Sequence, residues 1–330
     1  MNKKKLMDLV VNIIFVLVIY QFILFCYYFC KFVYKHFLVK EKNLLERYGE
    51  NSYVIITGGS SGQGKQFALK LAQRGFNIFL IGSERSKNTL SEINKLYPNV
   101  KTELIIKDFR KSFEKGFFDS IEKKIRKLNG NLSMLINNVA HRSAWIPYHE
   151  MPHQLINDTI AVGTIVQSQM IRICMPHFLK RTKKSSIVNI TAQCIMPTFG
   201  FGEILSNEIS VPFLSVYEAS NAFGHYHGNS IIKEYKKYKN KIDILNVMPG
   251  AVLTENTQFL SNTIFNVKSE VYVDNIIRII GNFYGNTYGY WGHAFSVFLI
   301  NCFPFMKNPI LHNVGHGIAT DYMKLPPKKY

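Results

Sequence analysis

The chain opens with a long apolar run that has lysines on both sides. Residues 9–30 are 22 consecutive uncharged residues. A helix of that length spans about 33 Å, which is enough to cross the apolar part of a bilayer. A cleaved signal peptide would have a shorter apolar region and small residues at its end, whereas this run ends in Tyr27, Tyr28 and Phe29. The pattern therefore predicts a basic tail over 1–8 and a transmembrane anchor over 9–30.

A polar stretch over 31–52, interpreted as a linker, leads into short apolar runs that alternate with amphipathic stretches. Residues 53–56 and 78–81 have the composition of buried strands, and the apolar positions between them, such as Phe67 and Leu71, have helical spacing. Strand, turn, helix and strand in this order open a parallel sheet with right-handed crossovers. We therefore expect an α/β fold over 53–287, a Rossmann-like doubly wound parallel sheet preceded by an N-terminal transmembrane helix.

The last part of the chain, 288–330, is first apolar and then basic. Residues 288–306 carry no charge, but Gly289, Gly292 and Pro304 interrupt them. Such interruptions favour a membrane-surface or re-entrant helix over a full span. We expect an apolar membrane-associated segment followed by a basic tail.

The excess of positive charge changes this picture little. The chain has 40 Lys and Arg against 22 Asp and Glu, a formal net charge of +18, and its 47% hydrophobic residues exclude an intrinsically disordered chain. Basic runs over 123–127, 180–184 and 233–241 contain no nucleic-acid recognition motif. We interpret them as solvated faces, with attraction to anionic lipid or to substrate phosphates as the alternative, and we expect no nucleic-acid partner.

The cysteines indicate a reducing compartment. They are scattered and include no CxxC pair, so they do not form a disulfide framework, and we expect the folded part to face the cytosol. Lysines on both sides of the anchor leave its orientation open. No metal-ligand spacing is present, and we expect no metal site. The five cysteines are Cys26, Cys30, Cys174, Cys194 and Cys302.

A glycine-rich turn lies between the first expected strand and the first expected helix. Glycines let the backbone approach a pyrophosphate, and the helix N-terminus presents free N–H groups and the positive end of its dipole. The strand–turn–helix context makes this signal much stronger than the glycines alone. The candidate cofactor-binding residues of the turn are Gly58, Ser60, Ser61, Gly62, Gln63 and Gly64.

The spacing TGxxxGxG and four later segments resemble the short-chain dehydrogenases/reductases. Residues 104–109 resemble the third strand of that family, 134–140 the fourth strand and the NNAG turn with Ala140 in place of its glycine, and 186–191 the fifth strand. Residues 242–254 resemble the sixth strand with the PGxVxT segment that lines the nicotinamide. The resemblance implies cofactor contacts at Asp108, Asn138, Pro249, Gly250 and Thr254.

The end of the second expected strand bears on the choice of cofactor. NAD sites usually have an acidic side chain there, whereas NADP sites favour a basic one that meets the 2′-phosphate. Gly82 occupies the acidic position, and Arg85 follows closely enough to meet a phosphate. This favours NADPH, although Glu84 next to Arg85 counts against it.

The resemblance implies catalysis by a tyrosine in a YxxxK motif, which protonates the carbonyl oxygen as hydride arrives. Tyr235 satisfies the literal motif with Lys239, but it lies only ten residues before Leu245 of the next strand and among many lysines. Tyr217 lies 32 residues before Pro249, as the family spacing requires. We therefore assign Tyr217 as the proton donor.

The family partners of Tyr217 are replaced in this chain. Asn221 takes the place of the lysine, Ala192 that of the serine and Gly163 that of the asparagine, unless a different helix register brings Asn157 there. Tyr217 and Asn221 remain candidate cofactor contacts. A reductase tolerates such losses better than an oxidising enzyme, because it needs the tyrosine protonated and the ordinary pKa of tyrosine is near 10. About 12 residues are inserted between Ala192 and Tyr217. Candidate replacement groups are Ser206 and Ser210 in this insertion, and His225 on the Tyr217 helix.

The anchor, residues 100–109 and the tail 288–304 resemble a narrower group, the microsomal very-long-chain 3-oxoacyl-CoA reductases and their 17β-hydroxysteroid dehydrogenase relatives. This implies an endoplasmic reticulum membrane enzyme that uses NADPH to reduce a ketone on a lipid, either a 3-oxoacyl-CoA of fatty-acid elongation or a steroid. The partners implied are an elongation complex or a second copy. Lys328 and Lys329 resemble a retrieval signal one position out of register. The alternative is a pseudoenzyme that keeps the nucleotide pocket and acts as a structural or regulatory subunit.

Overall fold

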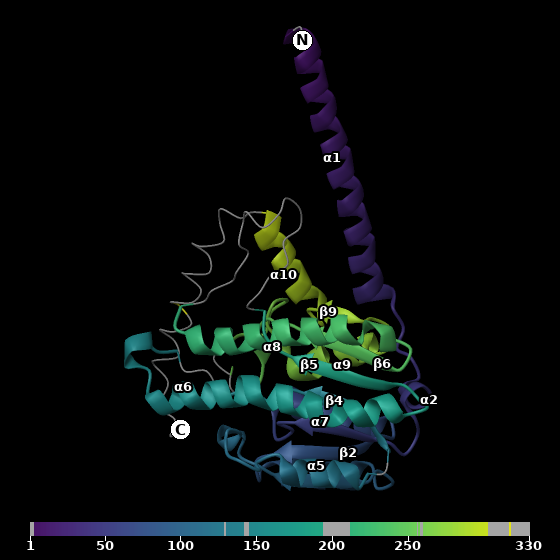
Figure 1. Cartoon of the computed structure of the whole chain (residues 1–330), viewed down its shortest axis with the longest axis vertical. Coiled ribbons are helices and arrows are strands. Elements are labelled where there is room, and N and C mark those ends of the chain that lie inside the picture. Colours follow the sequence, from purple (N-terminus) through teal and green to yellow (C-terminus); the bar gives the residue numbers. More distant parts are fainter. Residues whose placement is uncertain are drawn as a thin grey trace.

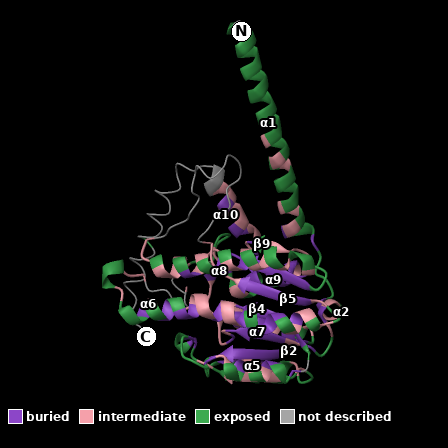
Figure 2. Ribbon diagram, viewed as in Figure 1, coloured by how far each residue is buried: buried purple, intermediate pink, exposed green. Residues whose placement is uncertain are grey.

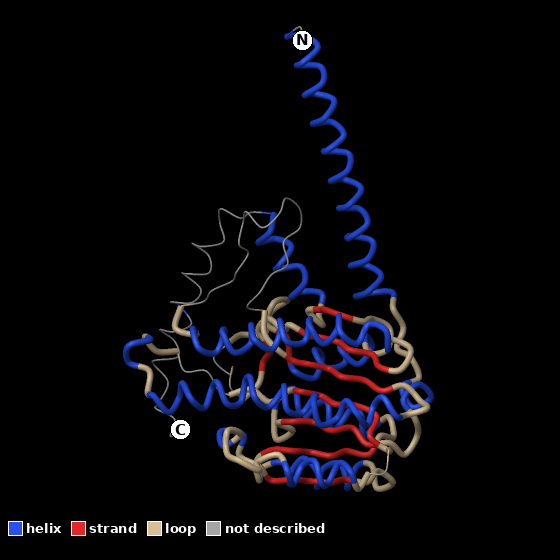
Figure 3. Tube along the Cα trace, in the orientation of Figure 1, coloured by secondary structure: helices blue, strands red, loops and turns tan. Residues whose placement is uncertain are grey.

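The computed structural model describes residues 3–128, 130–141, 145–193, 212–255, 257, 260–302 and Gly317. A seven-stranded sheet lies at its centre, in the order β3-β2-β1-β4-β5-β6-β9, and all its strand pairs are parallel (Figure 3). Chain order reverses between β1 and β4, so the expected doubly wound fold is confirmed. The strands are β1 (Tyr53–Thr57), β2 (Asn77–Gly82), β3 (Thr102–Ile106), β4 (Leu132–Asn137), β5 (Ser185–Ile190), β6 (Ile242–Val247) and β9 (Gly285–Thr287).

Helices cover both faces of the sheet, as a parallel sheet requires. The face toward the viewer in Figure 1 carries α5 (Asp119–Arg126), α7 (Val166–Lys180) and α8 (Ser215–Glu234). The opposite face carries α3 (Gly62–Gln73), α4 (Ser86–Leu96) and α9 (Ser269–Ile279). Between β4 and β5 the helix α6 (His153–Ile160) continues through a π-helical turn, η4 (Ala161–Ile165), into α7. The short ladder of β7 (Val252–Leu253) and β8 (Val267–Lys268) lies outside the main sheet. Short 3₁₀ turns are η2 (Phe109–Lys111), η3 (Tyr148–Glu150) and η5 (Tyr235–Tyr238).

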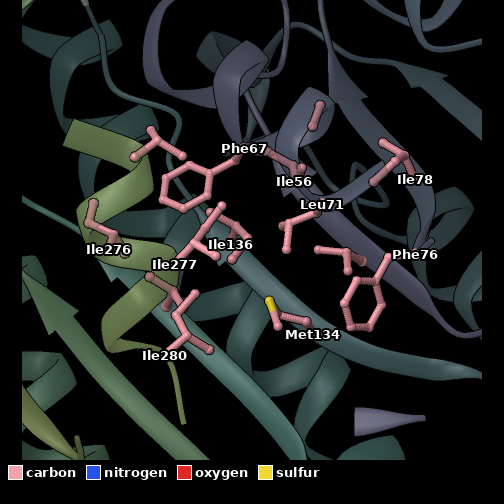
Figure 4. Packing of buried hydrophobic residues seen from close by; sticks show 14 of the residues in the cluster. Ile56, Phe67, Leu71, Phe76, Ile78, Met134, Ile136, Ile276, Ile277 and Ile280 are labelled. Carbon is pink, nitrogen blue, oxygen red and sulfur yellow. The ribbon is translucent and has the colours of Figure 1, made fainter. Parts of the chain in front are cut away.

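The core consists of two apolar layers, one on each face of the sheet. Successive residues of a strand point to opposite faces. Ile56 therefore packs with Phe67 and Ile277 in one layer (Figure 4), while the neighbouring Ile55 packs with Met170 in the other. Because helices cover both faces of the sheet, all six residues of β2 and of β4 are buried. The residues that follow these strands are therefore held in place by the core.

The helix α1 (Lys3–Val33) contains the expected anchor and has no buried residue. It projects away from the domain as an exposed rod (Figures 1 and 2). Together with the π-helical turn η1 (Tyr34–Leu38), it is the one helix in the described part of the chain that is long and apolar enough to cross a membrane, with a mean hydropathy of 2.7. The expectation of an N-terminal apolar helix is therefore confirmed.

The range 31–52, expected as a linker, is partly folded onto the domain. Its short helix α2 (Leu44–Tyr48) buries Leu44 and Tyr48 in the same layer as α3 and α9. The hydroxyl of Tyr48 donates to Asp243 at 2.8 Å, and Arg47 forms a bidentate ion pair with the same carboxylate. Arg278 also donates to the carbonyl of His36 at 2.7 Å. Leu44 and Tyr48 lie four residues apart and so share one face of α2. Their burial, together with these hydrogen bonds, attaches the base of α1 to the domain.

The helix α10 (Trp291–Cys302) forms most of the second apolar segment and lies on the same side of the domain as α1 (Figure 1). The rings of Phe25 and Phe298 are 6.1 Å apart, and those of Phe37 and Trp291 are 6.2 Å apart. Residues 303–306 and the lysines of the tail, Lys328 and Lys329, lie outside the described residues.

Candidate functional site

The glycine turn adopts the conformation that its sequence predicts. Gly58 has φ +74°, a region that favours glycine. A Cβ on Gly64 would lie 2.1 Å from the carbonyl oxygen of Gly58, so only glycine lets α3 start this close to the turn. The side-chain amide of Asn138, at the end of β4, donates to the carbonyls of Thr57 and Gly58 at 3.1 Å. Asn138 thus supports the turn from the neighbouring strand.

The N-terminus of α3 faces the groove above the carboxyl ends of the strands. The first N–H groups of a helix have no acceptor within the helix, which makes this end a binding place for a pyrophosphate. Ser60, Ser61, Gln63 and the glycines of the turn surround it. A Cβ on Gly62 would lie 3.0 Å from the methyl group of Thr254. The expected cofactor residues of the first and sixth strands therefore meet.

Two charged residues occupy the outer end of the groove, after β2 and β3. Arg85 forms an ion pair with Glu255 at 2.7 Å, and both side chains are more than half exposed. Asp108 accepts from the backbone N–H of Arg110 at 3.1 Å and pairs with the Arg110 guanidinium at 2.7 Å. These hydrogen bonds from Arg110 hold the pKa of Asp108 below its ordinary value. The groove therefore offers a cation and an anion at the end where the adenosine half of a dinucleotide would lie.

A small cavity lies at the carboxyl ends of β1, β4 and β5, beside α8. Tyr217 and Asn221 reach it from α8, and Gly163 reaches it from η4. Three of the expected catalytic positions are therefore brought together, and Ala192 directly follows Thr191 of the lining. The full lining is Thr57, Asn137, Val139, Ala140, His141, Val162, Gly163, Val166, Gln167, Ile190, Thr191, Tyr217, Ser220, Asn221 and Gly224.

The residues at the positions expected for partners of Tyr217 are held by local contacts. The amide of Asn221 donates to the carbonyl of Tyr217 at 2.9 Å, and the hydroxyl of Ser220 donates to the same carbonyl at 2.8 Å. A Cβ on Gly163 would lie 2.6 Å from the Ser220 hydroxyl oxygen. Gly163 thus allows α8 to approach the π-helical turn, and an asparagine there would displace Ser220.

The alternatives weighed from the sequence lie elsewhere. Asn157 is exposed on α6 and contacts His153. Tyr235 packs against the apolar layer under α7 and does not line the cavity. His225 is 7% exposed and bonds to Asn229 at 2.9 Å, and burial lowers its pKa, but it does not line the cavity either. Ser206 and Ser210 lie outside the described residues.

Several cavity residues carry no motif and were missed from the sequence. Gln167 of α7 donates to the carbonyl of Gly224 at 3.0 Å and so ties α7 to α8. The ring of His141 lies 3.3 Å from the Thr159 hydroxyl and 4.0 Å from the carboxylate of Asp158. Thr191 donates to the carbonyl of Val247 at 3.2 Å, and its place beside Ala192 was the one available signal.

A row of four asparagines, three of them buried, runs from the cavity to the exposed Asn286 at the edge of the sheet. Asn137, Asn189, Asn246 and Asn286 occupy paired positions on β4, β5, β6 and β9. Each side-chain amide donates to the next carbonyl oxygen, at 2.8, 2.9 and 3.2 Å. We call this row the asparagine ladder; it satisfies polar groups that would otherwise be costly inside the core.

The sheet is doubly wound, with the glycine turn and the α3 N-terminus at the switch point and Tyr217 in the adjoining cavity. This combination is typical of a nicotinamide-dependent oxidoreductase. The glycine positions that a Cβ would block fit such a cofactor. Residues 52–264 match the family model for short chain dehydrogenase. The chain belongs to the short-chain dehydrogenase family.

The relatives narrow the comparison further. The chain is 30% identical over 261 residues to a very-long-chain 3-oxoacyl-CoA reductase of Vanderwaltozyma polyspora, covering 75% of this chain and 71% of the relative. It is 28% identical over 285 residues to the reductase of the same name of Mus musculus, covering 84% and 83%. Hydroxysteroid dehydrogenase-like protein 1 of Gallus gallus is 28% identical over 266 residues, covering 78% and 73%. Both resemblances seen in the sequence are thereby confirmed, and the relatives give no support to a pseudoenzyme.

Solved structures confirm the fold. A short-chain dehydrogenase from Sphingobium yanoikuyae in complex with NADPH has a TM-score of 0.58 and 20% identity, covering 72% of this chain and 87% of its own. A 7beta-hydroxysteroid dehydrogenase has a TM-score of 0.64 and 19% identity, covering 78% and 94%.

Proposed function

We propose that the protein is a membrane-anchored, NADPH-dependent reductase of a lipid ketone, with a 3-oxoacyl-CoA as its substrate class rather than a steroid. The observation that carries this proposal is the position of Tyr217 in the cavity next to the glycine turn. The names of the Vanderwaltozyma polyspora and Mus musculus relatives support the acyl-CoA substrate.

The cofactor residues have separate roles in this proposal. The glycine turn and the first N–H groups of α3 bind the pyrophosphate. Arg85 binds the 2′-phosphate after it leaves Glu255, and Asp108 lies beside the adenine. Asn138 holds the turn, while Pro249, Gly250 and Thr254 border the nicotinamide half. When bound, NADPH supplies the hydride that reduces the ketone carbon.

Tyr217 supplies the proton. Its hydroxyl donates a hydrogen bond to the ketone oxygen and transfers the proton as negative charge develops there, which leaves an alcohol. The amide of Asn221 cannot supply the positive charge of a lysine, and Ala192 cannot donate a hydrogen bond. Loss of one donor to a developing oxyanion commonly lowers the rate by about 10² to 10³. We therefore expect a slow reductase.

The membrane part of the proposal rests on α1 and α10, which are apolar and lie on one side of the domain. With α1 in the endoplasmic reticulum membrane and the domain in the cytosol, a lipid substrate reaches the cavity from the bilayer side. The partners proposed are the other enzymes of fatty-acid elongation or a second copy of the chain.

The test uses the full chain in detergent with NADPH and a long-chain 3-oxoacyl-CoA. The wild type should oxidise NADPH, Tyr217→Phe should lose this activity, and Tyr235→Phe is the matched control that should keep it. If wild type and Tyr217→Phe are equally silent while NADPH still raises the melting temperature, the reductase function is wrong and the pseudoenzyme hypothesis gains its first support.

A further inference from the structure

His293 stands in the first turn of α10 and is 1% exposed. Its Nε2 lies 3.3 Å from the carbonyl oxygen of Ala251 and 3.1 Å from that of Phe265. Its Nδ1 accepts the backbone N–H of Gly250 at 3.2 Å. Because carbonyl oxygens only accept, these contacts require a neutral ring with the proton on Nε2. Burial lowers the pKa of His293 to about 4, in agreement with a neutral ring.

Two of the three backbone partners of His293, Gly250 and Ala251, belong to one loop, residues 249–255, which includes the short strand β7; the third, Phe265, lies just before β8. At the start of the loop, the carbonyl of Pro249 accepts from the backbone N–H of Gln193 at the end of β5. At its end, Thr254 meets Gly62 of the glycine turn and Glu255 pairs with Arg85. The loop therefore contacts both the glycine turn and the Arg85 side chain.

The beginning of the loop lies on the reacting side of the groove. A dinucleotide binds where the strand order reverses, with its pyrophosphate at the α3 N-terminus. Arg85 and Asp108 follow β2 and β3 on one side of that point, whereas Tyr217 and Gly250 lie on the side of β5 and β6. The half of the cofactor that meets Tyr217 must therefore pass Gly250.

Packing alone does not account for a histidine at this position. Its ring contacts the rings of Tyr272 and Tyr290, with centroids 5.3 and 5.4 Å apart. A phenylalanine would make the same ring contacts without the cost of burying two polar nitrogens. The hydrogen bonds to the loop are what only the imidazole adds.

The helix that carries His293 also reaches the anchor, since Trp291 lies against Phe37 and Phe298 against Phe25. The side chain of Gln193 adds a second tie, with Nε2 at 3.4 Å from the carbonyl of His293 and 3.3 Å from the hydroxyl of Ser296. The loop is thus fastened to the same helix that packs on α1.

We propose that His293 is a positioning residue for the cofactor: it holds residues 249–255 in the conformation that receives the nicotinamide half, and it couples this loop to α10. The inference rests on the proposed NADPH-dependent function.

The test compares NADPH with adenosine 2′,5′-bisphosphate, which contains only the adenosine half, by titrating each into the full-length protein in detergent. In His293→Phe, NADPH affinity should fall about tenfold, as expected for the loss of a buried hydrogen bond, while the affinity for the bisphosphate stays within about twofold. Trp291→Phe, on the same helix turn, is the matched control and should bind both ligands as the wild type does.

Two polar variants keep the test decisive if His293→Phe folds poorly. The amide oxygen of His293→Asn falls near the place of Nδ1 and can still accept from Gly250, whereas the longer His293→Gln cannot. His293→Asn should therefore bind NADPH more tightly than His293→Gln. Equal weakening of both ligands, or unchanged NADPH binding in all His293 variants, would overturn the inference, whereas a wild type that binds neither ligand would refute the proposed function itself.

Discussion

Arg85 and Glu255 form an ion pair of 2.7 Å across the outer end of the groove, between the end of β2 and the loop after β6. In the proposed function, Glu255 competes with the 2′-phosphate for Arg85. The two side chains are 65% and 52% exposed, so the pair contributes only a small free energy, about 0.2 to 1 kcal/mol.

The first prediction concerns this pair. Glu255→Gln should raise the affinity for NADPH about two- to fivefold, because Arg85 is then free for the phosphate. Arg85→Ala should lower the affinity for NADPH and leave that for NADH nearly unchanged. Fluorescence titration with both cofactors measures this, and Glu122→Gln, which removes a carboxylate paired with Arg126 on α5, is the control. Equal effects on NADPH and NADH would show that Arg85 does not contact the 2′-phosphate.

The second prediction concerns Ala192, where the family resemblance implies a serine. Ala192→Ser places a hydroxyl next to Thr191, at the end of β5 beside the cavity, and should raise the turnover number at least about tenfold if it reaches the ketone oxygen. The gain should disappear in the double variant with Tyr217→Phe, since both groups act on the same oxygen. Steady-state kinetics at saturating NADPH measures both variants. A gain that survives without Tyr217 would show that another group gives the proton.

The third prediction concerns the asparagine ladder. Asn189→Ala removes the acceptor of Asn137 and the donor to Asn246, and it should lower the free energy of unfolding by about 2 to 4 kcal/mol. Asn246→Ala should cost a similar amount. The double variant should cost less than the sum, because the two residues share one hydrogen bond. Urea unfolding measures this, with the exposed Asn286→Ala as a mild control, and strict additivity would argue against a coupled row.

The fourth prediction is a pH dependence of stability. Burial depresses the pKa of His293 from 6.5 to about 4. The unfolded chain therefore binds a proton between these values that the folded chain does not, and the stability present above pH 6.5 is lost as the pH falls toward 4. The loss due to His293 should approach roughly 3 kcal/mol. Melting temperatures over this range should fall less steeply in His293→Phe than in Trp291→Phe, and parallel curves would contradict the prediction.

The sequence predicted the parts of the protein that depend on local patterns. The alternation of apolar runs placed the first two strands and the glycine turn, since a buried parallel strand and a pyrophosphate turn need particular residues next to one another. The resemblance to the family placed the third to sixth strands. The helix α2 was missed because Leu44, Leu45 and Tyr48 are three apolar residues in a polar stretch, too few to show a period. Their burial depends on α3 and α9, which lie far away in the chain.

The candidate site was predicted less completely, because its contacts join distant segments. Gly163 read as a lost asparagine, yet its lack of a side chain is explained by Ser220, 57 residues later. The pairing of the ladder asparagines could not be predicted from the sequence, because only the register of four neighbouring strands shows that they satisfy one another. His293 lay in an apolar segment that was interpreted by its hydropathy alone.

The attachment of the base of α1 to the domain, through Tyr48 and through the bond from Arg278 to the carbonyl of His36, has a consequence for how substrate is found. With α1 in a bilayer, as proposed, the domain is attached rigidly rather than through a flexible linker, so its distance from one leaflet and its tilt are restricted. For the lipid substrate proposed above, the cavity would then meet substrate by two-dimensional diffusion, so the encounter rate would depend on the surface density of substrate rather than on its bulk concentration.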